Sequence, residues 1–168
     1  KSSGKTFLLS NLIQYYSTKH LCVLIIGPSE SSVDLLCNLQ TDIVLIIQIK
    51  SNGIFMSKND ESADLSQMGY IYATSINNYD DMLFERQTFD ILIVDDCERI
   101  KMSDLIGPMN SCRKFVFCGD IYQARNDILS IFSFLDIEKN QINFLRTQYS
   151  KSREIHSLEN SLIYNYST

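Results

Sequence analysis

Residues 89–96 read FDILIVDD, an apolar run that ends in two carboxylates. A short apolar run without alternation is typical of a strand buried on both faces, as in a parallel sheet. Ligands of open α/β sheets bind at the carboxyl ends of such strands, so Asp95 and Asp96 are candidate site residues. An acidic turn without a ligand is the alternative, but it does not predict the phosphate-loop pattern found at the front of the same chain.

Strand-like and helix-like segments alternate along the rest of the chain. Further strands are predicted at residues 21–26, 43–49, 70–73 and 114–118, and helices at 6–16, 31–39, 128–135 and 155–163. The last two helices are expected to close the domain at its carboxyl end. Residues 51–68 are polar and aperiodic, which predicts a surface loop or small insertion. The alternation predicts one α/β domain over residues 1–168, with a parallel sheet and helices on both faces.

Composition limits the possible classes of protein. The chain has 168 residues, of which 45% are hydrophobic and 21% charged, so a folded domain is expected. The net charge of −5 means that a nucleic acid would have to bind in a local groove. The apolar runs are far shorter than a membrane span, and five cysteines fit a reducing, intracellular compartment. Because the chain starts at Lys1 without a methionine, a fragment of a longer protein is expected.

Residues Ser3, Gly4, Lys5 and Thr6 match the second half of the phosphate-binding pattern GxxxxGK[ST] and open a predicted helix. In such a loop the glycine lets backbone N–H groups surround phosphates. The lysine reaches the β and γ oxygens of a nucleoside triphosphate, and the hydroxyl binds Mg²⁺. The pattern therefore indicates a nucleoside triphosphate and Mg²⁺ as ligands. The alternative is a Ser-Gly helix cap followed by a solvated lysine.

Residues 115–123, FVFCGDIYQ, form a third element of the same kind. A buried strand is predicted to end at Gly119-Asp120, followed by Gln123, whose amide could sense a γ-phosphate. When Gly119-Asp120 is considered alone, a plain turn is the favoured explanation. With the other two elements, it predicts that three polar strand ends converge on one crevice.

The order of these segments carries a family resemblance. SSGKT, VLIIGPSESSVDLL, YIYATS, FDILIVDDCE, FVFCGDIYQ and LRTQYSKSREIHSLENSLIYN follow one another along essentially the whole chain. This series resembles the superfamily 1 DNA/RNA helicases, in particular their Upf-like branch. The resemblance implies the first RecA-like domain of a P-loop motor that hydrolyses ATP. It also implies two partners, namely a second RecA-like domain of the same parent chain and single-stranded DNA or RNA.

The resemblance assigns roles at the nucleotide site. Lys5 and Thr6 would hold the phosphates and Mg²⁺, and Asp95 would complete the shell of the metal. Asp96 would be the base that activates water, and Gln123 would couple the γ-phosphate to movement of its strand.

The resemblance also assigns a nucleic-acid site. Pro28 and Ser29, with Ser31 and Ser32 close by, and Thr74 fall where the family binds the backbone of a single strand. Short hydroxyl side chains and backbone amides suit phosphate oxygens of any sequence. The alternatives are a strand-terminating turn with a helix cap at Pro28-Ser29 and a β-branched strand residue at Thr74.

Three departures from the family pattern bear on catalysis. Asp96 replaces the usual glutamate and is one methylene shorter, and Ser2 replaces a glycine of the phosphate loop. Ser150 stands where the family has an arginine that meets the γ-phosphate, and Lys151 or Arg153 would have to supply that charge. These changes favour, as an alternative, a catalytically degenerate helicase-like scaffold. A P-loop kinase or transporter-type ATPase is a further alternative.

Overall fold

The described part of the chain contains one six-stranded sheet. The computed structural model describes residues 4–40, 45–57, 70–79, 87–123, 129–134, 142–145, 147, 149 and 152–164. The sheet has the strand order β3-β2-β4-β1-β5-β6. The strands are β1 (Val23–Gly27), β2 (Ile46–Lys50), β3 (Gly53–Ser57), β4 (Ile71–Ser75), β5 (Phe89–Val94) and β6 (Cys112–Phe117). All neighbouring strands are parallel except the antiparallel pair β2 and β3. The predicted α/β sheet is confirmed.

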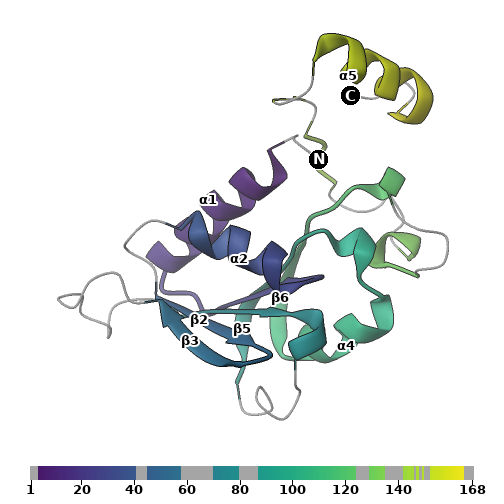
Figure 1. Cartoon of the computed structure of the whole chain (residues 1–168). Helices are drawn as coiled ribbons and strands as arrows, with labels where there is room; N and C mark the ends of the chain where they lie inside the picture. The colour runs from purple at the N-terminus through teal and green to yellow at the C-terminus, as the bar shows by residue number, and fades with distance from the viewer. Residues whose placement is uncertain are drawn as a thin grey trace.

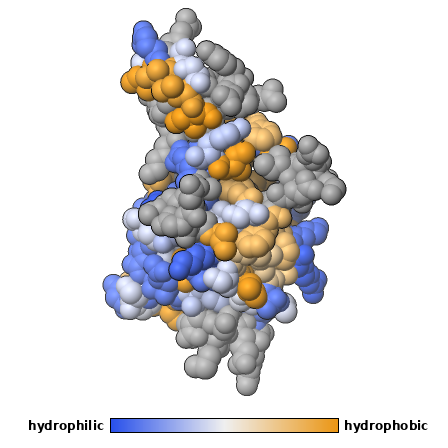
Figure 2. All heavy atoms as spheres, turned by 90° about the vertical axis from the view of Figure 1, so that its right-hand side faces the viewer, coloured by the Kyte–Doolittle hydropathy of each residue, from blue (hydrophilic) through white to orange (hydrophobic). Residues whose placement is uncertain are grey.

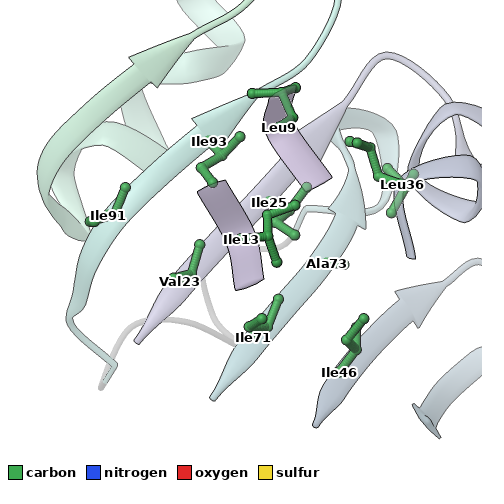
Figure 3. Close-up of a cluster of buried hydrophobic side chains, with 11 residues drawn as sticks. Leu9, Ile13, Val23, Ile25, Leu36, Ile46, Ile71, Ala73, Ile91 and Ile93 are labelled. Atoms are coloured by element: carbon green, nitrogen blue, oxygen red, sulfur yellow. The ribbon is translucent and has the colours of Figure 1, made fainter. Parts of the chain in front are cut away.

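Helices α1 (Lys5–Thr18) and α2 (Glu30–Asn38) cover one face of the sheet (Figure 1). Leu9 and Ile13 of α1 and Leu36 of α2 are at most 1% exposed and belong to one cluster with Val23 and Ile25 of β1. Figure 3 shows these helix side chains lying over the strand residues. The helical spacing in the sequence therefore identified most of the buried face of each helix. It was wrong for Leu8 and Leu39, which share that spacing but are 40% and 47% exposed.

Helix α4 (Met102–Asn110) covers the opposite face. Its Leu105 packs in a second cluster with Leu24 and Ile26 of β1 and with Leu92 and Val94 of β5. Because both faces of β1 and β5 are covered, their side chains are apolar without alternation, except for Asp90 near the start of β5. This pattern is expected for central parallel strands.

The segment predicted as a loop at residues 51–68 contains a strand. Residues 53–57 form β3, which returns antiparallel to β2 after a tight turn at Ser51-Asn52. Gly53 has φ +139°, a conformation that favours glycine. The Asn52-Gly53 pair is a strong hairpin signal, so the loop prediction was wrong for these residues because it weighed polarity above turn chemistry. Residues 58–69 lie outside the described part.

Three further predictions need correction. Within residues 129–134, the predicted helix is a 3₁₀ turn, η5 (Ile131–Ser133). The strand predicted as buried at 114–118 is β6, an edge strand whose Phe115 is 43% exposed. The last helix is present as α5 (Arg153–Glu159), which continues as the π-helix η6 (Asn160–Tyr164), but it does not close the core.

The apolar side chains of this last helix face outward. Ile155 and Leu158 of α5 and Leu162 of η6 are 53%, 59% and 72% exposed. Figure 1 shows α5 beyond the amino-terminal end of α1 and away from the sheet, and Figure 2 shows hydrophobic atoms on its surface. In the described residues, no helix has the length and apolar character needed to cross a membrane.

Candidate nucleotide-binding site

The start of α1 contains the described part of the predicted phosphate-binding loop. Gly4 precedes the helix with φ +82° and ψ 13°, in the left-handed region where glycine is unstrained. The backbone N–H of Leu8 donates to the carbonyl of Gly4 at 2.9 Å, so the helix begins at Lys5. No acidic residue stands in its first turn, which leaves the partial positive charge of the helix end for an anion. Ser3, predicted for this loop, lies outside the described residues.

An aromatic ring from the end of the chain lies over this loop. A Cβ atom added to Gly4 would lie 3.3 Å from Cε2 of Tyr149, whose side chain is 74% exposed. The structure thus places Tyr149, which belongs to a segment that resembles a family motif, beside Gly4. Gln148, Ser150 and Lys151 lie outside the described residues.

Asp95 follows β5 and is only 5% exposed. Burial, and secondly the charge of Asp96, raise its pKa from an ordinary 3.8 to about 6. The N–H of Asp96, which donates to Oδ1 of Asp95 at 2.9 Å, and the charge of Lys5 oppose this rise. Lys5 is therefore close enough to Asp95 to interact with it electrostatically, as the phosphate-loop prediction requires.

Asp96 adopts a conformation that is rare for a residue with a side chain. Its φ of 45° and ψ of 46° are left-handed, and it precedes the 3₁₀ turn η3 (Cys97–Arg99). An oxygen of its carboxylate lies 3.9 Å from Nη1 of Arg99, a loose ion pair. Unusual backbone conformations of this kind persist only where the surrounding structure holds them in place, and they cluster at functional sites.

Gln123 lies at the end of η4 (Ile121–Gln123), just beyond β6. Its side chain is exposed, and its Nε2 donates to Oδ2 of Asp120 at 2.7 Å. The backbone N–H of Tyr122 donates to Oδ1 of the same residue at 3.1 Å. Asp120 thus orders the turn and holds the amide of Gln123 in this conformation.

Sequence reasoning missed one carboxyl group of the site. Glu98, in η3, is only 3% exposed, and burial raises its pKa. The charge of Asp96 adds to this rise, while the charge of Lys5 opposes it. A glutamate in a turn after a strand is normally solvated, so no hydropathy signal distinguished it.

The predicted nucleic-acid residues lie at the same edge of the sheet. In the register of β1 with β4, Ile26 pairs with Thr74. Ser29 caps α2, and its side chain accepts from the N–H of Ser32 at 3.4 Å. Pro28 and Ser29 are partly exposed, whereas Thr74 is 0% exposed and its hydroxyl donates to the carbonyl of Ser75 at 3.2 Å. The contact predicted for Thr74 stays a prediction, with its side chain covered in this conformation.

The residues present suit a magnesium ion held together with phosphates. Mg²⁺ in such sites usually takes one or two protein oxygens and the oxygens of its substrate. Asp95 supplies a buried carboxylate, and Thr6 supplies a hydroxyl in the first turn of α1. Across the ranges described, no group of three or more His, Cys, Asp or Glu forms a protein-only metal centre. This donor set fits a metal that arrives with a nucleotide.

Comparison with known proteins shows which sequences and structures the chain is similar to. No family model matches it. The DNA replication ATP-dependent helicase/nuclease DNA2 of Bos taurus is 28% identical over 191 aligned residues, covering 96% of this chain and 18% of that protein. The Homo sapiens protein of the same name is 27% identical over the same shares. The Schizosaccharomyces pombe counterpart is 26% identical and covers 96% of this chain and 14% of that protein.

Among solved structures, an arterivirus nonstructural protein 10 helicase in complex with DNA aligns with a TM-score of 0.48 and 16% identity. The alignment covers 73% of this chain and 27% of that one. The chain spans less than one-fifth of the length of the curated relatives named above. Their sequence similarity over nearly the whole chain confirms the resemblance to superfamily 1 helicases. The described part of the chain has an α/β fold, and its sequence is similar over nearly its whole length to those of ATP-dependent helicase/nucleases.

Proposed function

We propose that this chain is the ATP-binding motor domain of a DNA helicase. In the full-length protein, it would couple ATP hydrolysis to movement along a single strand, together with a second RecA-like domain. The observation that carries this proposal is the convergence of Lys5 with Asp95 and Asp96 at one edge of the sheet. Two such domains are required because translocation depends on a cleft that opens and closes around ATP.

The side chains of the site divide the chemistry among them. Lys5 and the first turn of α1 would bind the β- and γ-phosphates of ATP, and Thr6 and Asp95 would hold Mg²⁺. When bound there, the ion would supply positive charge near the transferring phosphoryl group. Asp96 accepts the proton of the attacking water, and Gln123 senses the γ-phosphate after leaving Asp120.

The raised pKa of Asp95 supports its place beside a cation. A buried carboxylate next to a second carboxylate is unfavourable as an anion until a positive charge compensates it. Lys5 compensates only in part, since the pKa still reaches about 6. A divalent ion would complete the compensation, so the site is arranged to gain more from a metal-bound nucleotide than from an anion alone.

We propose that the nucleic acid along which the motor moves is single-stranded DNA, because the relatives are named for DNA replication. Backbone groups and hydroxyls near Pro28 and Ser29 would contact its phosphates, which requires no basic surface overall. An intracellular location follows from this proposal. Single-stranded RNA is the second candidate, and the assay below compares DNA with RNA.

The test is ATP hydrolysis by the full-length protein, measured with Mg²⁺ and with single-stranded DNA, single-stranded RNA or neither. Lys5→Ala removes the phosphate-binding charge, and Lys19→Ala is the matched control, since Lys19 is an exposed lysine at the other end of α1. We expect turnover that DNA stimulates, that Lys5→Ala abolishes and that Lys19→Ala leaves unchanged. Nucleotide binding without turnover in any condition would favour the degenerate scaffold, to which Asp96 in place of glutamate points.

A further inference from the structure

Glu98 is a buried carboxyl group without an obvious reason to be buried. It is 3% exposed, and its Oε2 has no hydrogen-bond partner in the described part of the chain. Leaving a polar atom buried and unpaired costs on the order of 1–3 kcal/mol. An apolar residue in this turn would avoid that cost. The presence of a carboxyl group therefore points to a role other than filling space in the core.

The carboxyl group of Glu98 packs directly on the turn that follows β6. A Cβ atom at Gly119 would overlap Oε2 of Glu98, and it would lie 2.8 Å from Cε2 of Phe132 and 3.0 Å from Sγ of Cys97. Only glycine fits at position 119 without displacing these groups. The N–H of Cys97 also donates to the carbonyl of Cys118 at 3.0 Å. The turn after β5 and the turn after β6 are therefore joined at this point.

A continuous series of polar contacts leads from Glu98 to Gln123. The backbone N–H of Glu98 itself, and less strongly that of Asp120, lower the pKa of the Glu98 carboxyl group and so oppose the effect of burial. The side chain of Asp120 in turn accepts from the N–H of Tyr122 at 3.1 Å and from Nε2 of Gln123 at 2.7 Å. The position of Gln123 thus depends on Asp120, and the position of Asp120 depends on Glu98.

We propose that Glu98 is a positioning residue that fixes the Gly119–Gln123 turn against the Asp95-Asp96 turn and thereby sets where Gln123 meets the γ-phosphate. This role rests on the proposed function, because it requires a nucleotide at the Lys5 site. Glu98 does not touch the nucleotide in this account. Its effect is to hold the turn after β5 and the turn after β6 together, so that a change at the phosphate reaches both turns.

The test compares Glu98→Ala with Glu98→Gln in the full-length protein. Alanine removes the acceptor for Asp120, whereas glutamine keeps a carbonyl oxygen of similar reach. Displacing a group by about 1 Å can lower turnover by up to roughly 100-fold. We expect Glu98→Ala to lower kcat for DNA-stimulated ATP hydrolysis by about 10- to 100-fold, a larger change than the rise in the KM for ATP that a weaker γ-phosphate contact brings. Glu98→Gln is expected to keep kcat within about 3-fold of wild type.

A second measurement separates positioning from folding. The ratio of ATP affinity to ADP affinity reports contact with the γ-phosphate and needs no turnover; we expect Glu98→Ala to lower it and Glu98→Gln to keep it. Glu154→Ala, which changes an exposed glutamate of α5, is the control and should leave kcat and the ratio unchanged.

The outcomes distinguish this role from the function on which it rests. Wild-type kcat and an unchanged affinity ratio in Glu98→Ala would overturn the positioning role alone. Equal loss of ATP and ADP binding in both Glu98 variants, with a lowered melting temperature, would show a purely structural role and overturn it as well. A wild-type protein that binds no nucleotide would overturn the proposed function and this role together.

Discussion

Replacing Asp95 by asparagine should stabilise the protein in the absence of nucleotide and Mg²⁺. Burial and the neighbouring Asp96 raise the pKa of Asp95 from 3.8 to about 6, so its ionised form is less favourable in the folded than in the unfolded state. At about 1.36 kcal/mol per pH unit, this difference corresponds to about 3 kcal/mol when the group is fully ionised. Asparagine keeps the side-chain oxygen that accepts from the N–H of Asp96.

The sign of the pH dependence follows from the direction of the shift. Because the folded state holds the proton more tightly, the contribution of Asp95 to stability is complete below pH 3.8 and is lost as pH rises through about 6. Asp95→Asn should therefore exceed wild type in unfolding free energy by up to about 3 kcal/mol at pH 8 and by little at pH 4.

Urea denaturation of both proteins at several pH values, in the presence of EDTA, measures this difference. Asp104→Asn, at an exposed carboxylate of α4, is the control and should change stability by less than about 0.5 kcal/mol. A lower stability of Asp95→Asn at pH 8, or a difference that does not vary with pH, would refute the reasoning.

Three further predictions concern the fold. Gly53→Ala should cost about 1 kcal/mol of stability, because the φ of +139° strains a residue with a side chain, although an added Cβ atom would meet nothing within 4 Å. An unchanged urea midpoint would contradict this. Ser29→Ala should cost about 1 kcal/mol through loss of the α2 cap, whereas the exposed Ser31→Ala should cost much less; equal effects would exclude capping as the cause. Cys97 is 0% exposed and burial raises its pKa, so a thiol reagent at pH 8 should modify it only after denaturant is added, as followed by mass spectrometry.

The sequence was most informative for the central strands and the two helices packed on β1. Their apolar spacing follows directly from burial on one or two faces, which is why Leu9 and Ile13 could be placed in the core from sequence. Local turn chemistry was harder to weigh, and the strand after Asn52-Gly53 was missed although the pair favours a hairpin. Amphipathic spacing did not predict packing at Ile155 and Leu158, because periodicity describes a helix face and not the partner that covers it.

The candidate site was predictable where residue type and chemistry coincide. Glycine followed by lysine at a helix start identified Gly4 and Lys5, and carboxylates after a strand identified Asp95 and Asp96. Glu98 could not be found in this way, since its role depends on contacts with a turn more than twenty residues further along the chain. Such contacts leave no periodic signal in a single sequence.

The measurement that tests the central claim most directly is equilibrium binding of ATP to the full-length protein, with and without Mg²⁺, for wild type and for Lys5→Ala. A charged hydrogen bond to phosphate is worth about 1.5–3 kcal/mol, so Lys5→Ala should weaken ATP binding by about 10- to 100-fold. We also expect Mg²⁺ to strengthen binding to wild type. Equal affinities of the two proteins would contradict the placement of the nucleotide at Lys5, and the absence of ATP binding by wild type would contradict the motor function itself.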